Sequence, residues 1–404
     1  MKNVRHKNII QLLNIYGALK VNFLAKNFSV TNETIRNDLN ELAGKGLIKR
    51  CHGGASIELT TLDNIARTEV IHYLESNKSL STKSVGEINV KKRVCVLGSF
   101  NVDMISYLHR LPEPGESLLA TNFIFAAGGK GCNQALAASY ADACVHFISK
   151  IGKDQFSDYA IKFITASRIS SSCIYQADEF HTGTASVFVN ENTGENMIAI
   201  SPGANMAVTV DEILLQKEKI VNSDVVLLQL ETNQEALEAV INIASENNIP
   251  VILNPAPYSR RVLNIIHNID YLTPNEKEAG LLSGISIIDL SSARLAAMKI
   301  HLMGVKNVII TLGKLGVIAF DGSSFIHSPA YPSAVKNTTG AGDAFNGALA
   351  AELSRGRPFA LSLKYACAFA SLAVETENAS DMPDNKSVLF RLEHTDYRQT
   401  ITEK

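Results

Sequence analysis

One stretch near the C-terminus, residues 337–349, combines glycines, a carboxylate and an apolar run. Gly340, Ala341 and Gly342 lead into a run that is predicted to be a helix, and Asp343 falls in its first turn. The free N–H groups and the positive dipole end of a helix start attract anions. A carboxylate beside such a backbone is suited to take a proton from a hydroxyl that attacks a phosphate. The alternative is a glycine-rich turn whose Asp only favours the helix dipole.

Further candidates follow short apolar runs. Asn101 and Asp103 come after the run that starts at Arg93, in a predicted turn. An amide and a carboxylate two residues apart could bind neighbouring sugar hydroxyls, or could only stabilise the turn. Glu231 ends the run 225–230, where its carboxylate could accept a hydrogen bond from a sugar hydroxyl or cap a helix.

A glycine-rich segment, residues 127–135, precedes a predicted helix of small residues. Gly129 allows close backbone approach, and Lys130 and Asn133 supply polar contacts. The segment is not a phosphate-binding loop of the Walker A type, because the spacing differs and no Ser or Thr follows the lysine.

Two more polar groups are candidates for a nucleotide and a metal. Asn275 and Glu278 are three residues apart and can share one face of a helix start. Oxygen ligands of this kind suit Mg²⁺, which keeps most of its waters, although acids at a helix start also occur for the dipole alone. Thr311, Gly313 and Gly316 offer a hydroxyl and open backbone along which a nucleotide could lie.

The elements that must position these residues are short apolar runs that alternate with helical stretches. This alternation favours a parallel sheet covered by helices on both faces. Ligands of such folds bind beyond the carboxyl ends of the strands, where the candidate residues fall. The runs are 93–98, 225–230, 250–253, 271–272 and 308–312.

The N-terminal 55 residues differ in charge from the rest. They carry nine Lys/Arg and three Asp/Glu, a net charge of +6, whereas the whole chain carries −2 and the remainder therefore −8. A small basic module on an acidic body suggests a contact with nucleic acid.

The apolar pattern of this module predicts three helices and a wing. Thr31 is a good N-cap for the third helix, in which Ile35, Leu39 and Leu42 face inward. This is the pattern of a winged helix-turn-helix, whose third helix enters a major groove; a three-helix structural or dimerisation bundle is the alternative. The remaining expected features are Ile9, Ile10, Leu12 and Leu13 in the first helix, Gly17 at its end, a second helix over 21–28 with Phe23, Leu24 and Phe28 inward, a turn at Ser29 and Val30, an end of the third helix at Gly44 and Gly46, a strand over 47–50 and a wing tip over 52–54.

Bulk properties limit the class of protein. The chain has 404 residues, of which 46% are hydrophobic and 19% charged, as in soluble globular proteins with two or three domains. No apolar run is long enough to span a bilayer and no secretory leader is visible, so we expect no membrane partner. The six cysteines are scattered without a CxxC pair, which argues against disulfides or a zinc site and fits the cytoplasm.

Six segments occur in the order and spacing of the PfkB sugar kinases, and residues 92–395 resemble that family and, within it, the ribokinases. The resemblance implies an α/β fold, a ribokinase-like sandwich with a mainly parallel sheet, flanking helices and a small β lid, and ATP as phosphate donor. Segments 118–125 and 182–200 should build the lid, which often supports a homodimer. The six segments are Gly98–Asp103, Gly128–Gln134, Asn254–Pro257, Thr273–Glu276, Thr311–Gly313 and Thr339–Asp343.

The same resemblance implies roles for single residues. Asp343 is the catalytic base, and the backbone of Gly340, Ala341 and Gly342 forms an anion hole. Glu278, with Asn275, orients Mg²⁺ through water. The sugar is held by Asn101, Asp103, Gly129, Lys130, Asn133 and Glu231, together with Asp343, and the nucleotide lies along Asn275, Thr311, Gly313, Gly316 and Gly342.

Three residues depart from the pattern of the ribokinases. Asn337 stands where the family usually has Asp, and Asn378 and Met382 stand where ribokinases tend to have Gly and Ser. These positions help to bind an activating K⁺ in ribokinases. Because a carboxylate and a hydroxyl are lost, we expect activation by a monovalent cation to be weak or absent.

The segments 30–42 and 46–55 resemble the DNA-binding domain of DeoR-type bacterial regulators. The resemblance implies that Thr34, Arg36 and Asn37 lie near bases or phosphates and that Lys49 and Arg50 contact the DNA backbone. Asn37 replaces a residue that is commonly basic there. The resemblance ends after Ala55, and residues 56–91 are predicted to be a linker.

Together these features predict a DNA-binding regulator, residues 1–55, fused to an ATP-dependent sugar kinase, residues 92–395, with ribose as the leading substrate. A sugar-sensing transcription factor with a catalytically weak kinase-like body is the rival. Another rival keeps the chemistry and changes the substrate to deoxyribose, another pentose or a nucleoside.

Overall fold

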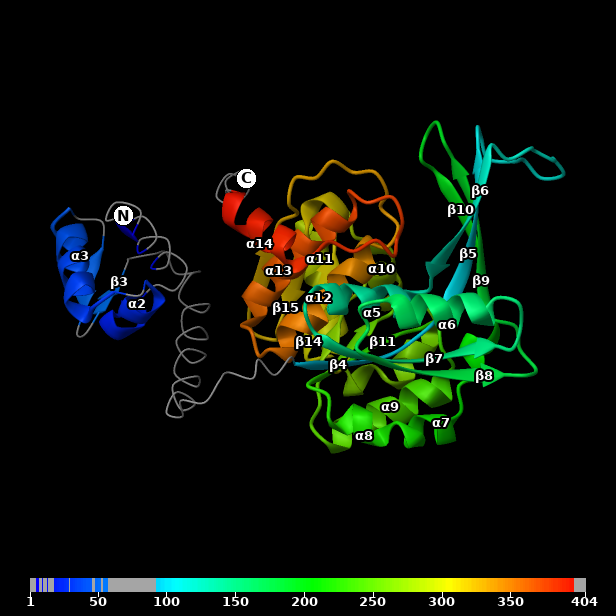
Figure 1. The fold of residues 1–404 in the computed structure, drawn as a ribbon, viewed down its shortest axis with the longest axis horizontal. Coiled ribbons are helices and arrows are strands. Elements are labelled where there is room, and N and C mark those ends of the chain that lie inside the picture. The colour runs from blue at the N-terminus through cyan, green and yellow to red at the C-terminus, as the bar shows by residue number, and fades with distance from the viewer. Residues whose placement is uncertain are drawn as a thin grey trace. The chain divides into compact units, whose positions relative to one another are not determined.

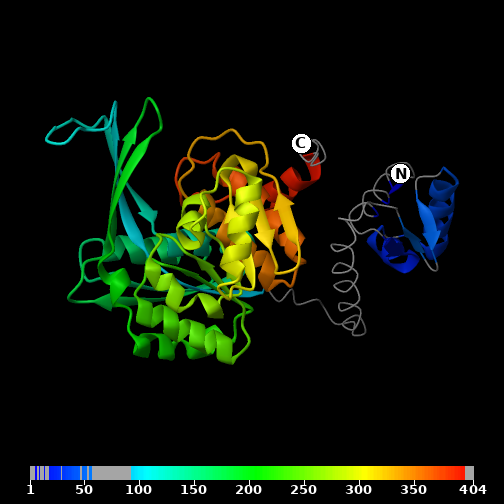
Figure 2. The same ribbon diagram turned by 180° about the vertical axis from the view of Figure 1, so that it is seen from behind.

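The computed structural model describes residues 5, 6, 9, 13, 18–28, 30–45, 48–51, 54–56 and 92–395. The chain forms two compact units, Met1–Ile88 and Asn89–Lys404 (Figures 1 and 2). Among the described residues, no helix is both long and apolar enough to cross a membrane. Several predicted features lie outside the described residues, namely Ile10, Leu12, Gly17, Ser29, Gly46, Leu47, His52, Gly53 and residues 57–91 of the linker.

Among the described residues of the N-terminal unit, residues 5, 6, 9 and 13 are helical, and the helices α2 and α3 accompany a small antiparallel sheet with the strand order β1-β3-β2. The apolar pattern of the sequence did not predict the strand β1. The strand β3 ends at Ser56, one residue beyond the predicted end of this module at residue 55. The elements are β1 (Ala18–Lys20), α2 (Val21–Asn27), α3 (Asn32–Gly44), β2 (Lys49–Cys51) and β3 (Gly54–Ser56).

Helix α3 begins and packs as its sequence predicts. The Thr31 hydroxyl accepts a hydrogen bond from the backbone N–H of Thr34, which satisfies one of the free donors of the first turn. Ile35, Leu39 and Leu42 are buried in one cluster with Ile9, Leu13 and Leu24, whereas Phe23 and Phe28 are only partly buried.

The inner face of α3 also carries a carboxylate. Asp38 is 1% exposed and accepts hydrogen bonds from Arg5 Nε at 2.6 Å and from His6 Nε2 at 2.9 Å. Burial favours the neutral acid, but the hydrogen bonds from Arg5 and His6 outweigh it, so the pKa of Asp38 lies below its usual value. Asp38 thus ties the start of the chain to the third helix.

The second unit is built on a nine-stranded sheet in the order β16-β15-β14-β13-β12-β11-β4-β7-β8. The strands from β14 to β8 in this order are parallel, and β15 and β16 are antiparallel at one edge. The predicted runs are confirmed as strands of this sheet. Its strands are β4 (Arg93–Leu97), β7 (Cys144–Gly152), β8 (Ser171–Ala177), β11 (Val225–Gln229), β12 (Val251–Asn254), β13 (Tyr271–Leu272), β14 (Asn307–Thr311), β15 (Val317–Phe320) and β16 (Phe325–Ser328).

Helices cover both faces of this sheet, as Figure 1 shows. The alternation of β4 separates the two cores: Val94 and Val96 pack in one apolar cluster, and Cys95 and Leu97 in the other. The first cluster is covered by α5 (Lys130–Tyr140), α6 (Ser157–Ala166), α12 (Ala341–Ser354), α13 (Phe359–Ala373) and α14 (Asn385–His394), and the second by α7 (Val210–Leu215), α8 (Lys217–Val221), α9 (Gln234–Glu246), α10 (Glu276–Ser283) and α11 (Leu290–His301).

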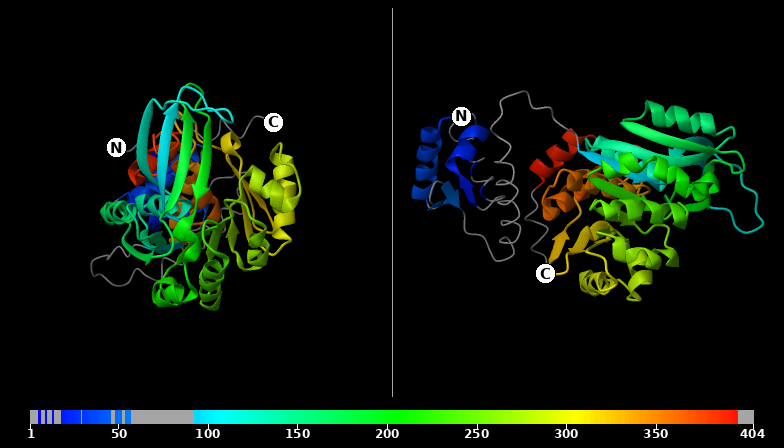
Figure 3. Two further views of the ribbon diagram at one scale, coloured as in Figure 1. Left: turned by 90° about the vertical axis from the view of Figure 1, so that its right-hand side faces the viewer. Right: turned by 90° about the horizontal axis from the view of Figure 1, so that it is seen from below.

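A smaller sheet stands out from the body, with its four strands side by side in the left view of Figure 3. The expected lid segments contribute β6, β9 and β10. The strand β5 is additional, so Asn101 and Asp103 lie on a strand and the predicted turn is wrong, because β5 finds partners on both sides. The order is β10-β9-β5-β6, from β5 (Asn101–Leu108), β6 (Asn122–Gly128), β9 (Gly183–Asn190) and β10 (Asn196–Ser201).

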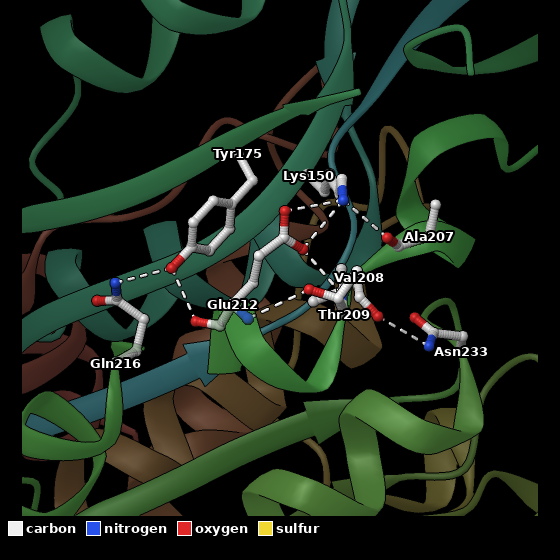
Figure 4. A network of polar contacts seen from close by, with 8 residues as sticks. All are labelled: Lys150, Tyr175, Ala207, Val208, Thr209, Glu212, Gln216 and Asn233. Atoms are coloured by element: carbon white, nitrogen blue, oxygen red, sulfur yellow. Dashed lines mark hydrogen bonds and ion pairs between the residues drawn. The ribbon is translucent and has the colours of Figure 1, made fainter. Parts of the chain in front are cut away.

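A partly buried polar network fixes α7 to the main sheet (Figure 4). Lys150 Nζ donates to Glu212 Oε1 at 2.8 Å and to the carbonyl of Ala207 at 2.8 Å. Tyr175 donates to the carbonyl of Glu212, and Gln216 Nε2 donates to the Tyr175 hydroxyl at 2.9 Å. Short 3₁₀ turns complete the unit at Gly203–Ala207, Arg260–Asn264, Ile266–Asn268 and Gly313–Leu315.

Candidate active site

Helix α12 presents the predicted base. Gly340 is its N-cap with φ of 83°, a left-handed conformation in which a Cβ would meet the Cβ of Ala379 at 2.9 Å. Asp343 lies in the first turn and is 6% exposed. The N–H of Ala341 donates to the carbonyl of Thr338 at 3.3 Å. The backbone N–H groups of Gly342 and Asp343 also belong to the first turn, where a helix offers its N–H groups no carbonyl acceptor. These two N–H groups are therefore available to an anion.

Two amide side chains of α5 hold the carboxylate of Asp343. Asn133 Nδ2 donates to Oδ2 at 3.2 Å, and Gln134 Nε2 donates to Oδ1 at 2.9 Å. Lys130, at the start of the same helix, has its pKa raised by the nearby charge of Asp343, with burial opposing and Glu231 adding to the effect. The ammonium group is therefore kept charged near the Asp343 carboxylate.

Asn101 and Asp103 lie two residues apart on β5, so their side chains share one face of the small sheet. Asn101 is buried and accepts from Asn205 Nδ2 at 2.9 Å. Burial, and then the charges of Glu231 and Asp343, raise the pKa of Asp103 to about 7. Gly128 leaves the room that this carboxylate needs, because a Cβ there would lie 2.2 Å from Asp103 Oδ2.

Glu231 follows β11 at the carboxyl end of the main sheet. It accepts from the Ser99 hydroxyl and from the backbone N–H of Lys130, the latter at 3.1 Å. Both donors come from segments far away in the sequence, so the folded body determines the direction of this carboxylate.

A cavity of about 410 Å³ joins these side chains between the sheet edge and the lid. The structure brings together most of the predicted sugar-site and catalytic residues there. Apolar residues of the small sheet, among them Ile105, Val187 and Ile198, line the other side. The predicted residues at its wall are Asn101, Asp103, Gly129, Lys130, Asn133, Glu231, Gly340 and Asp343.

The predicted nucleotide residues gather elsewhere on the same sheet edge, around the ends of β13 and β14. Asn275 is the N-cap of α10 and pairs with Thr311 in a parallel bridge. Gly313 begins the 3₁₀ turn after β14, and Gly316 is its C-cap. The residues around the sugar cavity do not include these four or Ala341 and Gly342.

Asn275 and Glu278 form a reciprocal cap at the start of α10. Asn275 Oδ1 accepts from the N–H of Glu278, and Glu278 Oε2 accepts from the N–H of Asn275, each at 2.9 Å. Burial raises the pKa of Glu278, against the backbone hydrogen bond and the charge of Lys130. Helix capping therefore uses Asn275 Oδ1 and Glu278 Oε2, and Glu278 Oε1 takes no part in these two hydrogen bonds. In the described part of the chain, no three His, Cys, Asp or Glu side chains cluster as a metal site.

Several buried polar residues that touch this site were not assigned a role from the sequence: Ser99, Gln134, Gln229 and Asn254. A usable signal existed for two of them. Gln134 interrupts a helix of small residues, and Gln229 ends an apolar strand between Leu228 and Leu230; both are fully buried. A polar side chain in such a position normally has a specific partner.

In the N-terminal unit, the predicted DNA contacts lie along α3 and β2. Arg36 and Asn37 are exposed and Thr34 is half-buried, and Arg36 lies 3.5 Å from Glu33. Lys49 and Arg50 are exposed on β2, where Arg50 also donates to the carbonyl of Gly54 at 2.8 Å. Four of the five predicted contact residues are therefore open to solvent, and Thr34 is partly so.

Comparison with known proteins identifies both units. The family model for pfkB family carbohydrate kinases matches residues 91–386, and the model for DeoR-like helix-turn-helix domains matches residues 5–61. A ribokinase of Haemophilus influenzae is 35% identical over 76% of this chain and 100% of its own length. A deoxyribokinase of Salmonella typhi is 32% identical over 70% of this chain and 92% of its own length.

Solved structures agree with this assignment. The Arabidopsis thaliana ribokinase complexed with ribose and ATP superposes with a TM-score of 0.70, at 32% identity, over 76% of this chain and 100% of that one. A ribokinase from Thermotoga maritima gives 0.68 at 32% identity, over 75% of this chain and 100% of that one. The chain therefore belongs to the pfkB family of carbohydrate kinases, as an ATP-dependent, ribokinase-like sugar phosphotransferase with a DeoR-like helix-turn-helix domain ahead of its kinase unit.

Proposed function

We propose that this chain phosphorylates the primary hydroxyl of a pentose, with D-ribose as the leading substrate, and also binds operator DNA as a transcriptional regulator. The observation that carries the enzymatic part is the buried Asp343 carboxylate in one cavity with Asn101, Asp103 and Lys130. Ribokinases and a deoxyribokinase among the relatives support a pentose but do not choose between the two sugars.

The side chains divide the work of binding the sugar. Asp103 and Glu231 accept hydrogen bonds from ring hydroxyls, and Lys130 donates to a hydroxyl oxygen. Asn133 Oδ1, which is buried without a partner in this structure, accepts one more. The apolar inner face of the small sheet excludes water, which suppresses hydrolysis of ATP.

Asp343 takes the proton of the primary hydroxyl while the hydroxyl oxygen bonds to the terminal phosphorus of ATP. The bond from that phosphorus to the bridging oxygen breaks, and ADP leaves. The amides of Gly342 and Asp343, at the positive end of α12, stabilise the charge on the transferring group. Thr311, Gly313 and Gly316 lie along the nucleotide.

Glu278 and Asn275 fit a hydrated Mg²⁺, because a buried carboxylate with one oxygen outside the capping pair can accept from metal-bound water. When bound, the ion supplies positive charge to the phosphates.

The residues expected for a K⁺ site do not fit. Asn337 Nδ2 donates to the carbonyl of Glu377 at 2.9 Å, and Met382 brings a buried thioether. We therefore expect weak or no activation by potassium, and a several-fold rise of kcat in potassium over kcat in a large organic cation would contradict this.

The chemistry is tested with the full chain, MgATP and a panel of pentoses and nucleosides, with release of ADP as the measurement. We expect D-ribose or deoxyribose to be turned over, and Asp343→Asn to lose about two orders of magnitude or more in kcat with sugar affinity within a few-fold. Asp158→Asn is the matched control, because Asp158 is an exposed carboxylate in the first turn of α6. An Asp343→Asn enzyme with wild-type kcat would remove the base from the mechanism.

The rival reading is a sugar-sensing regulator without turnover. It predicts that ribose binds, as seen by calorimetry, while no sugar of the panel releases ADP. The complete set of polar groups around Asp343 favours catalysis over this reading.

The regulatory part rests on the helix-turn-helix domain and on its exposed basic residues. Genomic selection of bound DNA by the full chain identifies the operator, and an Arg36→Ala/Asn37→Ala variant should lose sequence preference.

We place the protein in the cytoplasm, where its six free thiols stay reduced. We further propose a homodimer, because Phe123, Phe125 and Met197 expose apolar surface on the lid.

A further inference from the structure

We propose that Gln134 is the positioning residue of the catalytic base, and that Gln229 fixes the orientation in which Gln134 acts. This inference rests on the proposed role of Asp343. Gln134 is fully buried in α5, and its Nε2 lies 2.9 Å from Asp343 Oδ1. It is not among the residues that line the sugar cavity, so it contacts the base from behind and not the substrate.

The direction of the Gln134 amide follows from a backbone carbonyl. A carbonyl only accepts hydrogen bonds, so the contact of 3.1 Å between Asn254 and Thr273 O must use the Asn254 Nδ2 group. Asn254 Oδ1 then faces Gln134 at 3.1 Å and requires a donor there. Gln134 must therefore present its NH₂ group to both Asn254 and Asp343.

The other end of the Gln134 amide is held by Gln229. Gln134 Oε1 accepts from Gln229 Nε2 at 2.7 Å. A flipped Gln134 would set its oxygen against the oxygens of Asn254 and Asp343, so the three contacts allow one orientation. Gln134 consequently only donates to Asp343, which is the contact that an ionised carboxylate needs.

Gln229 is hard to explain by packing alone. It is the last residue of the apolar strand β11, is fully buried, and its Oε1 has no hydrogen-bond partner in the structure. An apolar side chain of similar size would fill this place without an unpaired oxygen. Its Nε2 contact to Gln134 is thus the feature that distinguishes it from a Leu or a Met.

With Asn133 on Oδ2 and Gln134 on Oδ1, both oxygens of Asp343 are held, which fixes the rotation of the carboxylate. A free carboxylate would turn relative to the hydroxyl it must deprotonate, and small misplacements of a base lower the rate strongly. Sugar binding depends on other groups. The role therefore predicts a loss in kcat with little change in KM.

The test compares Gln134→Met with Gln216→Met in the full chain. Both changes replace a glutamine by an apolar residue of similar length, but Gln216 lies in the remote network of Figure 4. We expect Gln134→Met to lower kcat roughly tenfold or more with KM for the sugar within twofold, and Gln216→Met to keep both within twofold. A Gln134→Met enzyme that folds and keeps wild-type kcat would overturn the inference.

A second arm asks whether the effect passes through Asp343. In the Asp343→Asn background, adding Gln134→Met should leave the residual kcat unchanged, because the oriented base is already gone. A further tenfold loss would mean that Gln134 acts elsewhere and would overturn the positioning role.

Gln229→Met is the variant to use if Gln134→Met fails to fold, since it removes an oxygen that is already unpaired. A several-fold loss in kcat at an unchanged melting temperature supports the inference, and wild-type kcat refutes it. The two proposals fail in different ways. If Asp343→Asn keeps its activity, both the role of Asp343 as base and the role of Gln134 are refuted. If Asp343→Asn is inactive while Gln134→Met and Gln229→Met are fully active, only the role of Gln134 is refuted.

Discussion

At the scale of residues, three carboxylates, Asp103, Glu231 and Asp343, share one cavity with Lys130. Under the proposed function, their mutual repulsion and their burial destabilise the sugar-free protein, and the same carboxylates bind the hydroxyls of the sugar. The cost appears in Asp103, whose pKa rises to about 7 through burial and through the charges of Glu231 and Asp343. Binding sites often oppose stability in this way.

Asp103→Asn should therefore stabilise the sugar-free kinase unit. Between the ordinary pKa of 3.8 and the folded value of about 7, the folded chain keeps a proton that the unfolded chain loses, so stability falls as pH rises through this window. The gain from the substitution should be larger at pH 8 than at pH 5 by roughly 2 kcal/mol. Urea unfolding followed by circular dichroism measures it. A variant less stable than the parent at pH 8 would contradict the argument.

At the scale of elements, the start of α12 depends on one backbone conformation. Gly340 is left-handed, and a Cβ there would meet Ala379, in the loop between α13 and α14. The same helix ends near Gly356, which is also left-handed but has open space around it. An alanine at Gly340 would therefore bring both backbone strain and a steric contact, whereas an alanine at Gly356 would bring backbone strain alone.

Gly340→Ala should lower kcat about tenfold or more, because the new methyl must displace the helix start that carries the anion-binding amides. Gly356→Ala is the control: each variant bears a left-handed strain of about 1–2 kcal/mol, but only the first moves the site. Steady-state kinetics and melting temperatures of both variants check this. Equal kcat in the two enzymes would show that the start of α12 tolerates the shift.

A comparable prediction concerns helix α3 of the helix-turn-helix unit. Asp38→Asn should destabilise this unit by about 2 kcal/mol or more, because it weakens the buried contacts with Arg5 and His6. Glu41→Gln, which weakens an exposed pair with Lys45 on the same helix, should cost at most about 0.5 kcal/mol.

The pKa of Asp38 lies below its usual value, so its contribution is present above the unfolded value of 3.8 and is lost as pH falls through the lower folded value. The free energy of unfolding of the parent's N-terminal unit should thus fall as pH drops through that range, and that of Asp38→Asn should not. Urea unfolding followed by circular dichroism measures it. Identical pH curves would refute the role of the buried pair.

At the scale of the whole molecule, the chain is two units with separate apolar cores. The kinase site draws its described residues from the second unit alone. We therefore expect residues 89–404 to fold without the N-terminal unit, to keep kcat within about twofold and to lose DNA binding. An insoluble or inactive fragment, with the full chain active under the same conditions, would mean that the first unit supports the second.

The sequence by itself determined the features that a few neighbouring residues encode. The apolar runs were recognisable as strands of a covered parallel sheet, and Thr31, Ile35, Leu39 and Leu42 defined the third helix of the DNA-binding unit. The order of the short motifs predicted the fold and the family. These signals are local because strand pattern, helix period and capping depend on residues only a few positions apart.

Only the tertiary structure decided which distant groups meet. Asn101 and Asp103 became part of a strand because β6 and β9 pair with β5 from both sides. Gln134 acquired its direction from Gln229 and Asn254, which lie 95 and 120 residues further along the chain. A side-chain amide can donate or accept at either end, so its role is undefined until folding supplies partners that fix one orientation.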